Sequence, residues 1–174
     1  ERILVKFPVT GATAGYIQYD RSQAFIPASG SVSFYLRLFN ARHSQTTPKD
    51  FQLVVSAVSR SWDEGLGLDM EEYSDIGAAN WQTASLDGET PIRWTAEGGD
   101  YHADVNSSFT ASFDPGFQDM ELDITPLVEQ WLDTSKPNYG VGVFLTSDEE
   151  NQQQSYYTKK FFARGSQYFF KRPI

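Results

Sequence analysis

The stretch Met120–Ser147, MELDITPLVEQWLDTSKPNYGVGVFLTS, decides the fold because two strand patterns in it flank one helix pattern. At its start, Met120, Leu122 and Ile124 alternate with two acidic residues. This period of two is typical of a half-buried strand. A second alternation covers residues 141–145. The stretch therefore predicts a strand, a short helix and another strand.

A short helix is expected near residues 126–133. Thr125 is a good N-cap, and Pro126 suits the first helical position because its missing N–H would be unpaired there anyway. The apolar side chains of this segment share one helical face; they are Leu127, Val128, Trp131 and Leu132. We therefore expect Trp131 to be a core residue. Lys-Pro-Asn then ends the helix, and Gly140 can take a positive φ at the following turn.

The rest of the chain contains short apolar segments bounded by turn residues. Expected strands cover residues 1–9, 31–39, 51–60, 109–113, 155–163 and 167–171, with room for a short strand at 16–19. Residues 62–79 and 80–104 show no sustained period and contain many turn residues. Seven or more short strands with turns between them predict an all-β fold, a two-sheet antiparallel β-sandwich.

Length and composition limit the class of protein. A chain of 174 residues is long enough for one domain with a sizeable core, so residues 1–174 are expected to form a single β-sandwich domain. The absence of cysteine excludes a disulfide framework and a thiolate metal site. No apolar run reaches the roughly 18 residues of a membrane span. Because the sequence starts at Glu1 and stops at Ile174 inside an apparent strand, we expect it to be part of a longer chain.

Charge is negative overall and unevenly distributed. The net charge is −9, and a nucleic-acid binder needs the opposite sign at its contact face. Residues 60–150 contain 20 acidic and 3 basic side chains, a net charge of −17, whereas residues 151–174 contain 5 basic side chains and no acidic one. Either the basic end neutralises the acidic body within one domain, or it makes a head-to-tail contact with another copy.

Several local patterns occur in a fixed order along the chain. They are Arg2–Phe7, Ser31–Phe39, Val54–Trp62, Trp94 followed by Gly98-Gly99-Asp100, Asp123-Ile124-Thr125 before the helix, Tyr156–Lys160 and Arg172-Pro173. Together they resemble the DNRLRE-type domain, a β-sandwich family related to carbohydrate-binding modules. The resemblance implies a jelly-roll-like strand order. Lys159-Lys160 departs from the family pattern, which has Arg-Glu at this place.

Three further runs, Arg42–Pro48, Tyr156–Phe161 and Phe169–Ile174, are similar to virion structural proteins of tailed phages. This similarity implies a non-enzymatic structural and adhesive domain of a virion protein, in the head or a tail appendage. Its partners would be other virion subunits, copies of itself or glycans, with no nucleic acid and no membrane. The alternative is a carbohydrate-binding module of a secreted bacterial protein, located outside the cell or on its surface. A hydrolase fragment is a weaker third interpretation.

Three tryptophans are candidates for carbohydrate binding, because exposed aromatic rings stack on sugar faces. Trp62, Trp81 and Trp94 all lie in loop-like surroundings. The competing interpretation is that these large amphipathic side chains close the ends of the sandwich.

The C-terminal segment is the candidate interface. Its seven aromatic residues are too many for one sheet face, so they indicate either a strand covered on both sides or a contact with another subunit. The candidate interface residues are Tyr157, Lys159, Lys160, Phe161 and Arg164.

Other candidates for chemistry are weak. The acidic, glycine-containing residues 63–75 could supply oxygen ligands to Ca²⁺, but their spacing is not that of an EF-hand, and a solvated loop is the simpler interpretation. His43 and His102 lie in no catalytic motif. No acidic pair lies in a recognisable glycosidase pattern. The sequence therefore predicts no enzyme, no cofactor and no metal.

Overall fold

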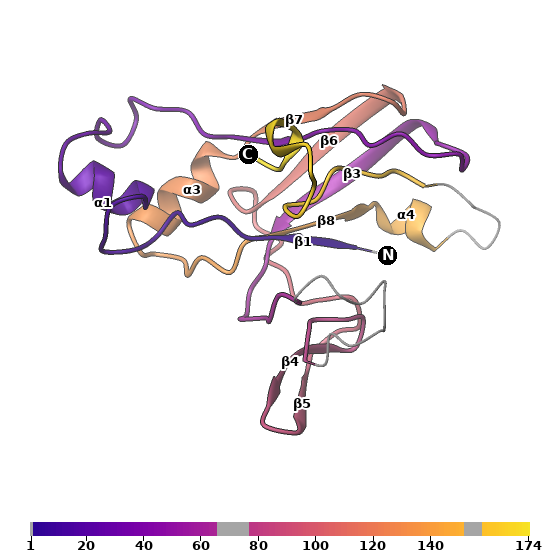
Figure 1. Ribbon diagram of the computed structural model, residues 1–174, viewed down its shortest axis with the longest axis horizontal. Coiled ribbons are helices and arrows are strands. Elements are labelled where there is room, and N and C mark those ends of the chain that lie inside the picture. Colours follow the sequence, from indigo (N-terminus) through magenta and orange to yellow (C-terminus); the bar gives the residue numbers. More distant parts are fainter. Residues whose placement is uncertain (1, 66–76, 152–157) are drawn as a thin grey trace.

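The computed structural model describes residues 2–65, 77–151 and 158–174 (Figure 1). The largest sheet is antiparallel, with the strand order β1-β8-β3-β6. Its strands are β1 (Ile3–Val5), β8 (Val141–Leu145), β3 (Lys49–Ala57) and β6 (Ser108–Pro115). The predicted all-β class is confirmed.

A second antiparallel pair joins β2 (Tyr35–Leu38) to β7 (Met120–Asp123), with Leu36 opposite Leu122. Its inward side chains share one core with the larger sheet. That core includes Leu36, Leu38, Met120, Leu53, Val55, Phe113, Val141 and Val143. Apart from the β4–β5 hairpin described below, the described residues pair as one four-stranded sheet and one two-stranded sheet, so the two-sheet sandwich and its jelly-roll order stay predictions.

The predicted helix is confirmed as α3 (Thr125–Leu132). Its N-cap position is Ile124 rather than Thr125, and the carboxylate of Asp123 accepts the backbone N–H of Thr125 at 2.9 Å. Trp131 is 1% exposed, as the shared helical face predicted, and belongs to the core between the two sheets. Gly140 takes φ +82° at the turn before β8, again as expected.

A hairpin lies in the region that the sequence indicated as irregular. Strands β4 (Thr83–Asp87) and β5 (Thr90–Arg93) pair with each other and with no other described strand, and they project from the main body (Figure 1). Beneath them a second, smaller apolar cluster contains Val58, Ala84 and Trp94. The hairpin lobe, residues 77–101, therefore has its own packing centre.

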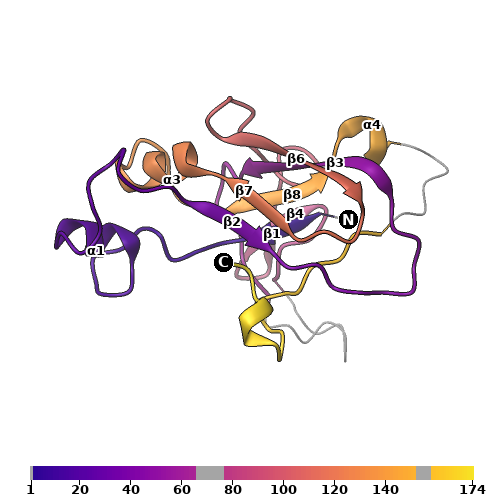
Figure 2. The ribbon, with the colours of Figure 1, turned by 90° about the horizontal axis from the view of Figure 1, so that it is seen from above.

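Residues 16–19 do not form the short strand for which the sequence left room. They belong to the start of α1 (Ile17–Ser22), which lies beside α3 at the end of the molecule opposite α4 (Ser147–Glu150) (Figures 1 and 2). The helix is fixed by contacts that local sequence does not reveal. The guanidinium of Arg21 forms a bidentate ion pair with the carboxylate of Glu129 in α3, with N–O distances of 2.7 and 2.9 Å.

The two expected C-terminal strands are also wrong for the described residues. An isolated bridge pairs Phe161 with Asn40, and residues Phe169–Lys171 form the 3-10 helix η1. The segment nevertheless runs along β2: Ile174 and Arg37 exchange backbone hydrogen bonds of 3.1 and 2.6 Å (Figure 2). A turn from Ala163 to Ser166 interrupts the extended chain. None of the described helices is long and apolar enough to cross a membrane.

Candidate functional site

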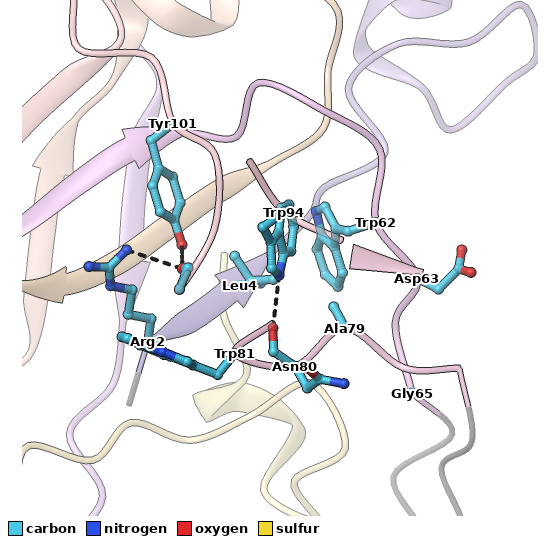
Figure 3. A pocket seen from close by; sticks show the side chains of 11 residues that line it. Arg2, Leu4, Trp62, Asp63, Gly65, Ala79, Asn80, Trp81, Trp94 and Tyr101 are labelled. Atoms are coloured by element: carbon cyan, nitrogen blue, oxygen red, sulfur yellow. Dashed lines mark hydrogen bonds between the residues drawn. The ribbon is translucent and has the colours of Figure 1, made fainter. Parts of the chain in front are cut away.

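The three candidate tryptophans come together at one pocket of about 340 Å³ between β1 and the hairpin lobe (Figure 3). Trp62, Trp81 and Trp94 line it, together with Arg2 and Leu4 from the start of the chain. Polar side chains at its rim are Asp63 and Asn80. We call this the tryptophan pocket.

The three indoles differ in how much of each can meet a ligand. Trp94 is 6% exposed, and its Nε1–H donates to the carbonyl of Asn80 at 2.8 Å. Trp62 is partly buried and donates to the carbonyl of Tyr139 at 2.7 Å. Trp81 is 44% exposed. Trp94 and Trp62 therefore pack mainly in the smaller apolar cluster, and Trp81 is the ring available to solvent.

Arg2 forms one wall of the tryptophan pocket. Its guanidinium donates to both carboxylate oxygens of Glu150, at 2.9 and 2.6 Å, and to the carbonyl of Gly98 at 3.1 Å. It also lies over the ring of Phe144, 4.8 Å from the centroid. The hydrogen bond with Glu150 raises the pKa of Arg2 against the opposing effect of burial. Arg2 is therefore a fixed cation that uses three of its five N–H donors in these contacts.

The Gly98-Gly99-Asp100 sequence shapes the floor of the pocket. Gly98 has φ +88°, and a Cβ there would come within 2.8 Å of both Arg2 and Trp81. The Asp100 carboxylate accepts the backbone N–H groups of Thr95 and Ala96 at 3.0 Å. Burial alone would raise the pKa of Asp100, but these N–H groups and Arg60 outweigh burial and lower it. The carboxylate of Asp100 thus fixes the conformation of the loop from Thr95 to Asp100.

The tryptophan pocket presents one solvent-exposed ring among its lining side chains. One exposed indole offers an apolar face, while the side-chain oxygen of Asn80 already accepts the backbone N–H groups of Gln82 and Thr83, at 2.9 and 3.0 Å. The Asp63 carboxylate points away from the indoles (Figure 3). Within residues 2–65, 77–151 and 158–174, no group of three or more His, Asp or Glu side chains could hold a metal ion. Most of the acidic loop that sequence proposed for Ca²⁺ lies outside the described residues.

The candidate interface residues divide into two kinds. Lys159 points inward, and its Nζ donates to Asn40 Oδ1 and to two backbone carbonyls. Phe161 is partly buried against the main core. Lys160 and Arg164 are exposed, and Arg164 pairs with Glu64 at 3.1 Å. Tyr157 lies outside the described residues.

A second exposed feature, which we call the aromatic surface, was not among the predicted interface residues. It consists of Phe117, Phe162, Tyr168, Phe169 and Phe170, of which all but Phe169 line a cavity of about 710 Å³. Edge-to-face contacts of 5.6 to 6.3 Å connect the four C-terminal rings. Phe169 is 73% exposed and Phe170 is 62% exposed. The surplus of aromatic residues was the sequence signal for this surface.

The two histidines do not meet. His43 lines a cavity of about 440 Å³ beside Arg42 and Phe117. Burial, and then the charge of Lys136, lower the pKa of His102. Lys136 Nζ donates to Asp104 at 2.8 Å and also contacts the hydroxyl of the fully buried Ser107. This cluster fixes the loop before β6.

A scan against models of protein families, a search of curated proteins and a search of solved structures each found no match. The resemblance to the DNRLRE-type domain therefore stays a prediction.

Proposed function

We propose that this chain is a non-enzymatic structural and adhesive β domain whose aromatic surface contacts another protein subunit. In the version that we favour, it belongs to a phage virion protein of the head or a tail appendage, and its partners are copies of itself or other virion subunits. The observation that carries the proposal is the exposure of Phe169 and Phe170 beside Phe117. A contiguous exposed apolar surface marks an interaction site more often than isolated apolar residues do.

Two features of the aromatic surface support protein contact. Its rings pack edge to face, so they are held in place rather than scattered, and little side-chain entropy remains to be lost on binding. Arg42 and Lys171 border the same cavity, and aromatic residues together with arginine are enriched at protein interfaces.

Charge contrast supports the proposal less strongly than the aromatic surface does. The pair between Arg164 and Glu64 favours neutralisation of the acidic body by the basic end inside one chain. Both side chains are largely exposed, and such pairs contribute little to stability. Electrostatic attraction between copies would therefore act mainly on the rate of encounter.

Sedimentation velocity tests the proposed subunit contact. We expect the 174-residue chain to associate at micromolar concentration, and the double variant Phe169→Ser/Phe170→Ser to remain monomeric. The matched control is Phe25→Ser, which removes a phenylalanine that is 76% exposed outside the aromatic surface. A wild-type chain that stays monomeric, or a control that dissociates equally, contradicts self-association through the aromatic surface.

The second candidate function is carbohydrate binding, for an extracellular or cell-surface protein. It is favoured by the meeting of three tryptophans at one pocket with Trp81 open to solvent. A titration with neutral oligosaccharides, followed by tryptophan fluorescence, tests it. We expect a saturable change that Trp81→Ala abolishes and that Phe169→Ser/Phe170→Ser retains. No change at millimolar oligosaccharide contradicts this function.

A further inference from the structure

An amine and an amide that can react with each other lie in contact near the end of β2. Lys159 Nζ is 2.7 Å from Oδ1 of Asn40, the residue that forms the isolated bridge with Phe161. Because Oδ1 is one bond from Cγ, Nζ is already close to the ~3–3.5 Å separation of a near-attack geometry. The contact thus places a nucleophile beside a carbonyl carbon.

The surroundings of this contact are partly apolar, and both Lys159 and Asn40 are half-buried. The rings of Phe113 and Phe161 lie 5.0 and 4.9 Å from Lys159 Nζ. The backbone carbonyls of Gly116 and Gln118 accept hydrogen bonds from the same nitrogen, at 2.9 and 2.6 Å. These contacts hold Nζ in place, and a partly desolvated lysine amine is a better nucleophile than a fully solvated one.

A carboxylate lies at the same place. Asp119 directly precedes β7, and its Oδ1 accepts the backbone N–H of Asn40 at 2.7 Å. Burial lowers the pKa of Lys159 to about 8, and the nearby charge of Asp119 opposes this change. A lysine with a pKa near 8 is neutral in a useful fraction of molecules at ordinary pH. The segments after β2 and at the C-terminus therefore bring an amine against an amide, and the exposed Asp119 carboxylate is hydrogen-bonded to the backbone of the same asparagine.

We propose that Lys159 and Asn40 form an intramolecular isopeptide bond, with Asp119 as the proton acceptor. The neutral amine of Lys159 attacks Cγ of Asn40, and a C–N bond forms while the carbonyl electrons move to Oδ1. Asp119 takes one proton from the attacking nitrogen and delivers it to Nδ2. The Cγ–Nδ2 bond then breaks, the carbonyl re-forms, and one molecule of ammonia leaves. No oxidant, reductant or metal is needed.

The bond closes a loop between positions 119 residues apart in the sequence. It fastens the C-terminal segment, which carries the aromatic surface, to the end of β2. This inference goes beyond the proposed function and does not depend on it, because a cross-linked chain can be either a virion subunit or a sugar-binding module.

Intact-mass spectrometry of the purified chain tests the bond. We expect a mass lower than that of the sequence by one ammonia, and a proteolytic peptide pair joined between Lys159 and Asn40. The linked pair distinguishes this bond from ammonia loss at any other asparagine. Lys159→Arg and Asn40→Ala should each have the full mass, while Lys160→Arg, the matched control, should still lack one ammonia.

The role of Asp119 has its own test. Asp119→Asn should keep the circular dichroism spectrum of the wild type but form the bond slowly near pH 7. The rate should recover above pH 9, where the amine is neutral and hydroxide can take the proton from the attacking nitrogen in place of Asp119. If Asp119→Asn forms the bond as fast as the wild type at every pH, then Asp119 takes no part in the reaction. A folded wild-type chain that retains its full mass after prolonged incubation at pH 9 overturns the proposal.

Discussion

The guanidinium of Arg2 lies over the indole of Trp81, 5.1 Å from the ring centroid, while Glu150 binds two of its nitrogens. Through this arrangement β1 and α4 hold the hairpin lobe against the main sheet. Both charged side chains are less than one-quarter exposed, so the pair is not screened as a surface pair would be.

Glu150→Gln should therefore destabilise the protein by about 1–2 kcal/mol, because the partly buried guanidinium of Arg2 loses a charged partner. Denaturant unfolding measures the loss. Asp148→Asn is the matched control, since Asp148 is exposed on the same short helix. Equal midpoints for Glu150→Gln and the control would show that the Arg2 contact contributes nothing.

Trp131→Ala should destabilise by about 3–5 kcal/mol, because the indole is almost fully buried between the sheets. Trp131→Phe should cost clearly less. The indole Nε1–H of Trp131 has no hydrogen-bond partner among the described residues, so phenylalanine removes an unpaired polar group while it keeps much of the volume. Guanidinium unfolding of both variants gives the comparison, and a phenylalanine variant as unstable as the alanine variant contradicts it.

Asp100 should contribute stability that depends on pH. Its folded pKa is lowered, so the folded chain binds fewer protons than the unfolded chain between the two pKa values. The contribution is present above the unfolded pKa of about 4 and is lost as pH falls through the folded pKa. Asp100→Asn should be less stable than the wild type at pH 7, and the two should converge toward pH 2. A difference that is constant over this range would contradict the assignment.

Gly140→Ala should destabilise by about 1–3 kcal/mol, because φ is +82° and the new Cβ would collide with the carbonyl of Val5. Gly165→Ala provides the control, since no atom lies within 4 Å of its Cβ position. Thermal unfolding of the two variants should separate them, and a Gly140→Ala protein that melts with the control would contradict the close approach of β1.

Calcium should not affect stability if the acidic residues 63–75 are a solvated loop. We expect the same melting temperature in chelator and in millimolar CaCl₂. A ligand that binds only the folded state raises stability by mass action, so a calcium-dependent increase would instead indicate a site in this loop.

Local patterns predicted the elements whose side chains alternate or share a helical face. Trp131 is the best case, because helix spacing alone indicated its burial. The hairpin β4–β5 was missed because Ala84 is its only fully buried side chain, so little period remains to detect. Its signal was Gly88, which with Glu89 forms the two-residue loop between the strands and takes φ +61°, since glycine at the first loop position is typical of a tight hairpin turn.

Long-range contacts were beyond sequence reasoning. Lys159 was predicted to face a partner, yet its acceptors come from Asn40, Gly116 and Gln118, which only the folded chain brings near it. The tryptophans were identified as site candidates, but their meeting around Arg2 depends on the position of β1 in the main sheet. The C-terminal alternation indicated strands, whereas the turn at Ala163–Ser166 interrupts them.

The pairing of β1 with β8, in which Ile3 lies opposite Val143, has a consequence for biosynthesis. The first strand leaves the ribosome long before β8, its partner among the described residues, has been made. Folding therefore waits for most of the chain, and such non-local pairing slows it further, toward milliseconds or seconds. During translation the apolar face of β1 stays exposed, where chaperones can bind it or where it can aggregate. Growth at lower temperature, or co-expression of chaperones, should therefore increase the yield of soluble protein.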